Sequence, residues 1–218
     1  MVYFFESKHD EYSAPHMIVT GKDKFENDFL IKYGFKELEY IWFHADSYSS
    51  GHIYLQLTNG EKSLDDVPDG VINDCLQLCK ASSIAGNKLP ECTILITPWT
   101  NLRKNKYMNP GEVSFKTLKN CKRRKCFSRD NKIINRLTKT RVEMAENVEE
   151  TLHDAKKSKD GFYFNKYLAA NNQRLIEEEI QRQRLKKEKK KQQKKKNPQK
   201  QGDVDVELEK DVETVTKI

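Results

Sequence analysis

Residues 41–55, with the sequence Ile-Trp-Phe-His-Ala-Asp-Ser-Tyr-Ser-Ser-Gly-His-Ile-Tyr-Leu, decide the fold. Apolar and aromatic side chains lie on both sides of a polar, glycine-containing segment, which is the pattern of two strands joined by a tight turn. We therefore expect strands at 41–45 and 52–57, with a turn at 47–51. The alternation of side chains in the second strand indicates that it belongs to a half-buried sheet.

The segments around this hairpin show further strand and helix patterns. An apolar stripe at helical spacing predicts a core-facing helix that begins at 63–68 and ends at Gly86. Strands are predicted at 2–6, 17–20 and 92–97, a short helix at 25–33, and a closing hairpin between 113–117 and 125–128. This order of elements predicts an α+β fold with a mixed sheet packed with two helices.

The second half of the chain has a different character. From residue 130 the apolar spacing predicts helix, with a break at 153–161, that continues into a lysine-rich run. Residues 181–200 hold eleven Lys or Arg and one Glu, whereas residues 201–218 hold six Asp or Glu and two Lys, in a chain of net charge +7. Such blocks of like charge commonly serve as interaction arms. We expect an α+β domain at 1–128, a long charged helical or coiled-coil extension at 129–197 and a disordered acidic tail at 198–218.

The composition argues against several classes of protein. No apolar run approaches the roughly 20 residues of a membrane-spanning helix, and no signal peptide is recognisable. We therefore expect no membrane span and a cytoplasmic protein, with a nuclear fraction as an alternative. The five cysteines form no disulfide framework, and Cys75 and Cys79 fit buried thiols better than a zinc site. We expect no metal and no cofactor.

Two histidines are the candidates for chemistry. His44 and His52 lie on the two strands of the hairpin, so their imidazoles are expected within several ångströms of each other. Such a pair can act as general base and general acid on a phosphodiester or an ester. It can equally contact phosphate or hold the turn, and no nucleophile elbow or phosphate-binding loop motif accompanies it.

Basic residues form three groups in a first part of the chain that is nearly neutral overall. They lie in the first turn, after Trp99 and in the expected closing hairpin, and each group can neutralise phosphates. Trp99 leaves a strand into a basic loop, which favours a surface platform for unpaired bases, whereas Trp42 is also a candidate for the core. The candidate nucleic-acid-binding residues are Lys22, Lys24, His44, Ser50, His52, Trp99, Arg103, Lys104, Arg123 and Arg124.

Four motifs, in this order, resemble the NFACT-R domain, which is an RNA-binding module. They are Gly21-Lys22-Asp23-Lys24-Phe25-Glu26-Asn27, Ile41-Trp42-Phe43-His44, Ser50-Gly51-His52-Ile53 and Pro110-Gly111-Glu112-Val113. The first five residues, residues 97–102 and the charged helical end are similar to the coiled-coil domain-containing protein 25 family. The chain departs from the family pattern at Tyr40, where an acidic residue usually precedes Ile-Trp. The resemblance implies association with RNA or the ribosome, as in quality-control factors that recognise peptidyl-tRNA on split large subunits.

Three functions follow from these features. The first is an RNA-binding protein that engages tRNA or rRNA on the large ribosomal subunit in translation quality control, with the lysine-rich run adding salt-sensitive affinity. The second is a peptidyl-tRNA hydrolase or nuclease, a release factor that uses His44 and His52 as its acid–base pair. The third is a helix-mediated scaffold, or a DNA-binding module if the basic helix meets duplex phosphate. The residues favour binding over catalysis.

Overall fold

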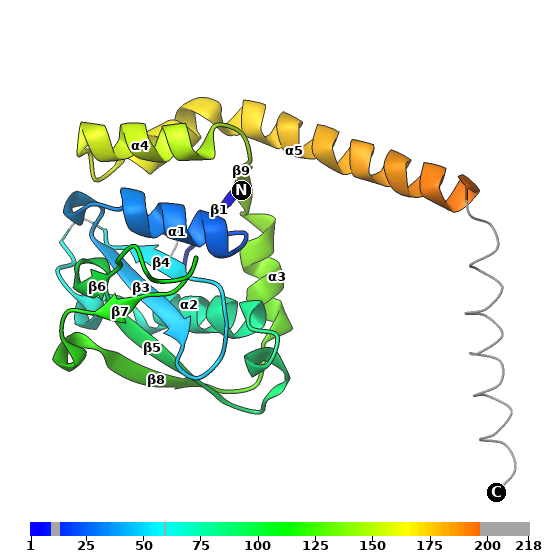
Figure 1. Ribbon diagram of the computed structural model, residues 1–218. Coiled ribbons are helices and arrows are strands. Elements are labelled where there is room, and N and C mark those ends of the chain that lie inside the picture. The colour runs from blue at the N-terminus through cyan, green and yellow to red at the C-terminus, as the bar shows by residue number, and fades with distance from the viewer. Residues whose placement is uncertain (10–13, 59, 197–218) are drawn as a thin grey trace, which may run out of the picture. The chain divides into compact units, whose positions relative to one another are not determined.

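The computed structural model describes residues 1–9, 14–58 and 60–196, with side chains described as far as residue 192. Its main element is an antiparallel seven-stranded sheet in the order β8-β5-β3-β4-β2-β1-β9 (Figure 1). The strands are β1 (Val2–Ser7), β2 (His16–Gly21), β3 (Tyr40–Ala45), β4 (Ile53–Gln56), β5 (Cys92–Pro98), β8 (Lys122–Cys126) and β9 (Val142–Met144). A separate ribbon pairs β6 (Leu102–Arg103) with β7 (Ser114–Phe115).

The hairpin predicted from residues 41–55 is confirmed, because β3 and β4 pair with Trp42 opposite Tyr54. β5 pairs with the other edge of β3, so β4 and β5 run in the same direction on the two sides of β3. Helix α2 (Asp69–Ser82) makes the crossover between them. Since β3 separates these two strands, every pairing among the described strands is antiparallel. The α+β fold is therefore confirmed, with an antiparallel rather than a mixed sheet.

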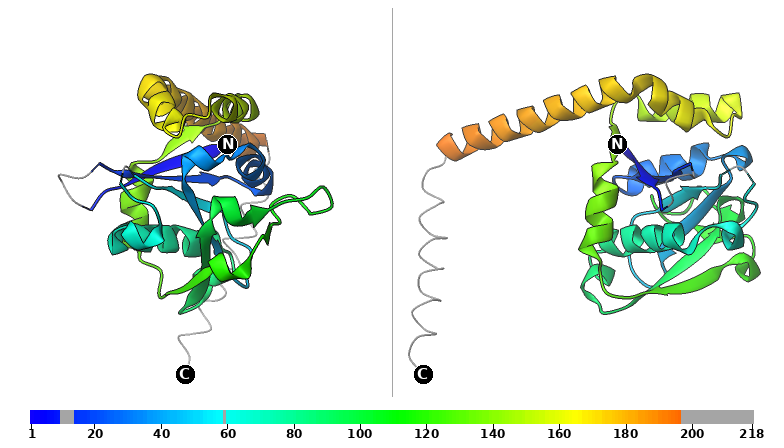
Figure 2. Two further views of the ribbon diagram at one scale, coloured as in Figure 1. Left: turned by 90° about the vertical axis from the view of Figure 1, so that its left-hand side faces the viewer. Right: turned by 180° about the vertical axis from the view of Figure 1, so that it is seen from behind.

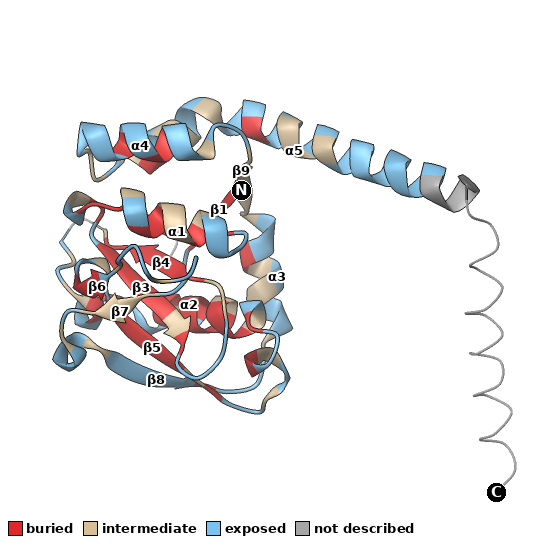
Figure 3. Ribbon diagram, in the orientation of Figure 1, coloured by how far each residue is buried: buried red, intermediate tan, exposed pale blue. Residues whose placement is uncertain are grey.

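Alternation along β3 explains the two helical layers that cover the sheet (Figures 1 and 2). Ile41 and Phe43 join the core beneath α2 and α3 (Asn131–Lys139), where they lie with Leu137. Trp42 joins the core on the other face, beneath α1 (Lys24–Tyr33) and α4 (Val148–Ser158), with Leu152. The buried positions follow the central strands and the inner sides of the helices (Figure 3). Trp42 is 1% exposed, which confirms its place in the core.

The apolar stripe predicted between residues 71 and 79 forms the buried face of α2. Ser63 caps a separate 3₁₀ turn, and Pro68 directly precedes α2, so the predicted helix is divided at this proline. Cys75 and Cys79 are buried, and burial raises the pKa of both thiols, which keeps them protonated and unreactive. Among the described residues, no group of three or more His, Cys, Asp or Glu could hold a metal ion.

One prediction of secondary structure is wrong, and a second is right only in part. Residues 113–117 do not pair with 125–128, because β7 pairs with β6 while β8 pairs with β5. The buried strand β5 has backbone groups on both edges that need partners, and β8 supplies them on the side away from β3. The predicted break at 153–161 is shorter than expected, because α4 continues through His153 to Ser158 and the helix is interrupted only at 159–162, before α5.

By its contacts the chain forms two units, Met1–Leu175 and Ile176–Ile218. Helix α5 comprises Tyr163–Lys196. β9 pairs with β1, so the first unit continues beyond residue 128. The predicted boundary at residue 128, between the α+β domain and the helical extension, stays a prediction. No helix among the described residues is long and apolar enough to cross a membrane. The predicted acidic tail at 198–218 lies outside the described residues.

Candidate nucleic-acid interface

A cavity of about 760 Å³ lies at the end of the sheet where β2 leads into α1 and where β3 turns into β4. All four sequence motifs contribute to its walls, although they are far apart in the chain. The end of α2 completes it. We call it the polar cavity and define it by Lys22, Lys24, His44, Ser50, His52, Gly111 and Arg129.

The first wall of the polar cavity is the turn that starts α1. The Asp23 carboxylate caps the helix through a first-turn N–H at 2.8 Å, and Asn27 Oδ1 accepts from the Gly21 N–H at 3.1 Å. A Cβ on Gly21 would lie 2.6 Å from Asn27 Oδ1, so glycine is required there. Lys22 and Lys24 are exposed in this turn, and neither has a carboxylate partner among the described residues. Two exposed ammonium groups beside the capped start of α1 make this wall suited to bind an anion.

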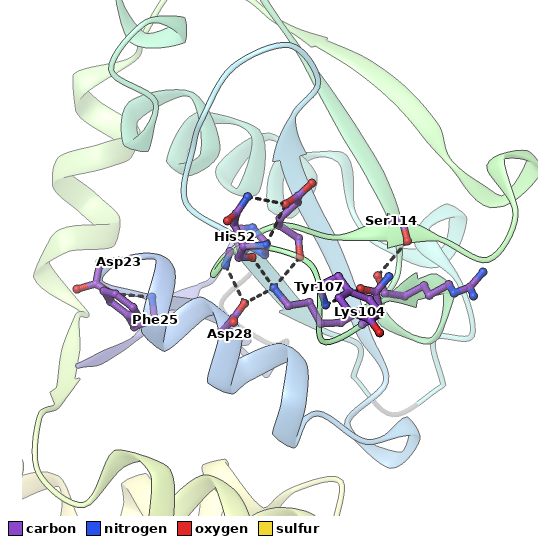
Figure 4. Close-up of polar contacts among 12 residues, drawn as sticks. Asp23, Phe25, Asp28, His52, Lys104, Tyr107 and Ser114 are labelled. Atoms are coloured by element: carbon purple, nitrogen blue, oxygen red, sulfur yellow. Dashed lines mark hydrogen bonds and ion pairs between the residues drawn. The ribbon is translucent and has the colours of Figure 1, made fainter.

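The adjoining wall is the loop around Gly111, which lies against Lys24 and is held in place by Lys104 and Asp28 (Figure 4). Lys104 Nζ lies 2.8 Å from Asp28 Oδ1 and donates to the carbonyl oxygens of Asn109 and Glu112 at 2.6 and 2.9 Å. Asp28 Oδ1 also accepts from the Gly111 N–H at 2.7 Å. Gly111 has a φ of 81°, a conformation that favours glycine. Because all three N–H groups of Lys104 have partners, this predicted nucleic-acid contact serves to hold the loop.

The turn between β3 and β4 forms the base of the cavity. Ser50 Oγ accepts from the Ala45 N–H and donates to the Gly51 carbonyl oxygen, both at 3.0 Å. The Gly51 N–H donates to Ser82 Oγ at 2.9 Å, which ties the turn to the end of α2. Ser50 therefore lines the cavity, but its hydroxyl is engaged in holding the turn.

His44 and His52 lie beside each other in this cavity, with ring centroids 5.0 Å apart. Trp42 Nε1–H donates to His52 Nδ1 at 3.0 Å, and because indole only donates, that Nδ1 carries no proton. His44 Nδ1 lies 2.7 Å from the Ala45 carbonyl oxygen. A carbonyl oxygen only accepts, so Nδ1 of His44 carries the proton. Each neutral imidazole is thus held in one tautomer.

Both histidines are neutral near pH 7. Burial lowers the pKa of His52 to about 3, and the neighbouring His44 acts in the same direction. Burial also lowers the pKa of His44, which is half-buried. A two-histidine acid–base mechanism needs one protonated imidazole. The pair is therefore poorly suited to proton transfer at neutral pH. His52 is buried, so the half-buried His44 is the member that a ligand can reach.

Trp99 lies outside the polar cavity. Its half-buried ring packs on Gly34, where an added Cβ would lie 2.4 Å from the indole. With Phe35 and Tyr40 it lines a second cavity, of about 410 Å³, at the opposite end of β3. The Trp99 indole N–H and the Tyr40 hydroxyl are buried without a hydrogen-bond partner among the described residues. These contacts make Trp99 a packed residue rather than a free platform.

The remaining predicted arginines also lie outside the polar cavity. Arg103 is exposed on β6. Arg123 and Arg124 are exposed on the edge strand β8 and pair with Asp46 and Asp69 at 2.8 and 3.2 Å. Exposed ion pairs are weak, but a phosphate would have to displace a carboxylate from each arginine. Lys22 and Lys24 need no such exchange.

Two exposed aromatic residues and one arginine add to the site beyond the predicted residues. Phe25 is 56% exposed in the first turn of α1, and Tyr107 is 83% exposed in the loop that Lys104 holds. The ammonium groups of Lys24 and Lys106 lie 5.3 and 5.1 Å from the centroids of these rings. Aromatic rings beside lysines can stack on unpaired bases. The arginine is Arg129, which lines the polar cavity. The sequence indicated Tyr107 by its position after Lys106 in a basic loop, but no pattern indicated Arg129.

The basic segment of α5 belongs to the second unit. Side chains from Arg184 to Lys191 are exposed, and five of these eight residues are lysines. Arg182 lies 3.8 Å from Glu178, one turn earlier in the helix. This segment is a helical, positively charged arm, and residues 197–200 of the predicted basic run lie outside the described residues.

Comparison with known proteins places these features in a family. Residues 1–117 match the model described as the NFACT protein RNA binding domain. Protein JLP2 of Saccharomyces cerevisiae is 65% identical over 179 residues, 82% of this chain and 86% of that protein. Coiled-coil domain-containing protein 25 of Danio rerio is 45% identical over 143 residues, 66% of this chain and 67% of that protein.

The matched residues 1–117 contain every residue that defines the polar cavity except Arg129. The predicted resemblance is therefore confirmed, and the motifs that carry it are the walls of one cavity. The chain belongs to the NFACT-R family of RNA-binding domains, in the group that contains Protein JLP2 and coiled-coil domain-containing protein 25.

Proposed function

We propose that the polar cavity binds unpaired nucleotides of tRNA or rRNA, and that the protein acts on the large ribosomal subunit in translation quality control. RNA as a partner follows from membership of the family. The class of RNA, the ribosomal partner and a cytoplasmic location are the proposal. One observation carries it: four distant motifs converge on one cavity with two lysines at a helix N-terminus, neither of which has an ion-pair partner among the described residues.

The charges and rings of the cavity suit a single-stranded segment. Lys22 and Lys24 can neutralise two phosphates beside the first turn of α1, whose N–H groups are capped by Asp23. Phe25 and Tyr107 provide exposed rings for stacking on bases. The lysines of α5 add contacts that depend on charge rather than on sequence, because a phosphate backbone is the same in every RNA.

A peptidyl-tRNA hydrolase or nuclease is the second candidate, because two imidazoles lie 5.0 Å apart within the same cavity. Their neutral state near pH 7 favours binding over catalysis. Incubation of the full-length protein with peptidyl-tRNA separates the two, since only an enzyme releases peptide or cleaved RNA. DNA is an alternative partner of the basic segment of α5, and competition between RNA and duplex DNA tests it.

Charge removal in the cavity tests the proposed function. Lys22→Gln with Lys24→Gln should weaken binding to tRNA and large-subunit rRNA fragments in fluorescence anisotropy. The slope of log affinity against log salt should fall by about 1.4, because each single-strand phosphate contact contributes about 0.7. The matched control is Lys139→Gln with Lys157→Gln, which removes the same charge from exposed positions on α3 and α4. Equal losses in the two double variants would reject the cavity as the RNA site.

A further inference from the structure

We propose that His44 makes the protein prefer RNA over DNA, because its Nε2 accepts a hydrogen bond from a ribose 2′-hydroxyl in the polar cavity. This inference rests on the proposed function, since it names the group by which the same cavity recognises its ligand. His44 thereby becomes a specificity-determining residue rather than a phosphate contact or a base.

The hydrogen bond of His44 to the backbone leaves Nε2 of the ring as a hydrogen-bond acceptor. Nδ1–H donates a hydrogen bond to the Ala45 carbonyl oxygen at 2.7 Å, so the neutral ring has its accepting lone pair on Nε2. No hydrogen bond joins Nε2 to any described residue. His44 is half-buried and lines the polar cavity. Its Nε2 is therefore the polar atom of the ring that remains available to a ligand.

The neighbouring rings fix the position of this acceptor. The His44 imidazole stacks on the Trp42 indole, with centroids 5.4 Å apart and planes 4° from parallel. The His52 ring meets it nearly at right angles, at 80°, and is itself held by the Trp42 N–H. An imidazole packed on two sides and bonded at Nδ1 cannot turn to present a donor instead. Such prior positioning reduces the entropy lost on binding.

Three of the four charged side chains that line this cavity are donors, and the fourth, the Asp23 carboxylate, is engaged in capping α1. Lys22, Lys24 and Arg129 carry N–H groups. Those donors suit phosphate oxygens, which only accept and cannot bond to a neutral Nε2. Burial lowers the pKa of His44, so the ring stays neutral at pH 7. The partner of Nε2 must therefore be a donor of the nucleic acid.

The donor that best fits this position is the hydroxyl of the sugar. The sugar is bonded directly to the phosphate that the lysines hold, whereas donors on the base differ from one nucleotide to the next. The 2′-hydroxyl is the donor of an internal sugar, and DNA lacks it. A fixed acceptor beside a phosphate site would thus distinguish RNA from DNA without reading the sequence.

The experiment compares three oligonucleotides of one sequence: RNA, DNA and 2′-O-methyl RNA, which retains the oxygen but has no donor. Wild-type protein should bind RNA about two- to twelve-fold more tightly than the methylated strand, the range for one net hydrogen bond. His44→Phe keeps a ring to stack on Trp42 and removes the acceptor. It should lose this preference through weaker RNA binding, with binding to the methylated strand unchanged. His44→Gln, whose amide oxygen can accept, should restore part of the preference.

Two controls keep the outcome decisive. His153→Phe changes an exposed histidine on α4 and should leave the preference intact. The Trp42 indole N–H resonance, which reports its bond to His52, should persist in His44→Phe if the site is folded. Equal binding of RNA and 2′-O-methyl RNA by the wild-type protein, or equal weakening of both strands in His44→Phe, would overturn the inference while leaving RNA binding in place. Failure to bind RNA at all would reject the proposed function itself.

Discussion

Gly34→Ala should destabilise the protein only while Trp99 is present. The indole lies on Gly34 so closely that a Cβ there would be 2.4 Å from a ring carbon and 2.5 Å from Nε1. Gly34 has a φ of −57°, which alanine adopts without strain, so the cost comes from the displaced ring alone. Overpacking of this kind costs about 1–3 kcal/mol.

The double-mutant cycle gives this prediction its magnitude. Trp99→Ala should cost about 2 kcal/mol, roughly half the loss for a fully buried tryptophan, because Trp99 is half-buried. In that background Gly34→Ala should be neutral or slightly stabilising, since the new methyl group meets no ring. The coupling between the two positions is then about 1–3 kcal/mol.

Urea unfolding, followed by circular dichroism, measures the free energy of unfolding of the wild-type protein, the two single variants and the double variant. RNA affinity is measured beside it, at a temperature where each variant is folded, and Trp99→Ala should change it less than about two-fold. Equal costs of Gly34→Ala in the two backgrounds would refute the packing contact. Unchanged stability of Trp99→Ala, with RNA binding weakened by the 1–3 kcal/mol expected for a stacked base, would restore the surface-platform interpretation.

Three further predictions concern the basic run at 181–200, the buried His52 and the loop that Lys104 holds. Deletion of residues 181–200 should weaken RNA binding broadly and flatten its salt dependence, as anisotropy at several salt concentrations would show; an unchanged slope would make this run a solvated helix end only. The pKa of His52 is about 3 in the folded state, well below its value of about 6.5 in the unfolded chain. Between these two values the unfolded chain carries a proton on His52 that the folded protein does not. The free energy of unfolding should therefore fall as pH drops from about 6.5 towards 3. His52→Gln should reduce that fall in urea titrations, whereas His153→Gln should not. Lys104→Met removes the ammonium that ties its loop to α1, so the Gly111 amide should exchange hydrogen faster, and retained protection would argue against this role.

Local patterns explain how much of the fold could be predicted. Trp42, the hairpin and the stripe of α2 follow from alternation or helical spacing within a few residues. The partners of β7 and β8 depend on which strand edge remains free once the sheet has assembled, and no local pattern contains that information. The helix α4 was missed because its short apolar face, around Leu152 and Ala155, lies among charged residues.

The candidate site was predicted in part for a similar reason. Lys22 and Lys104 are both lysines in basic turns, yet only Lys104 meets a carboxylate, and that carboxylate, Asp28, is 76 positions away in the sequence. Trp99 resembled a surface platform because its contact with Gly34 is also distant in sequence. The closeness of His44 and His52 could be predicted because a single turn connects their strands.

Ultraviolet crosslinking of RNA to the full-length protein in cells, with mass spectrometry of the peptide–nucleotide adducts, tests the central claim most directly. The polar cavity as RNA site predicts adducts on the peptides that contain Phe25 or Tyr107. These exposed rings belong to the first turn of α1, next to Lys24, and to the loop that Lys104 holds. Sequencing of the bound RNA should then return tRNA or large-subunit rRNA. Adducts confined to the β8 edge or to the peptide of Trp99, with none at Phe25 or Tyr107, would contradict the account.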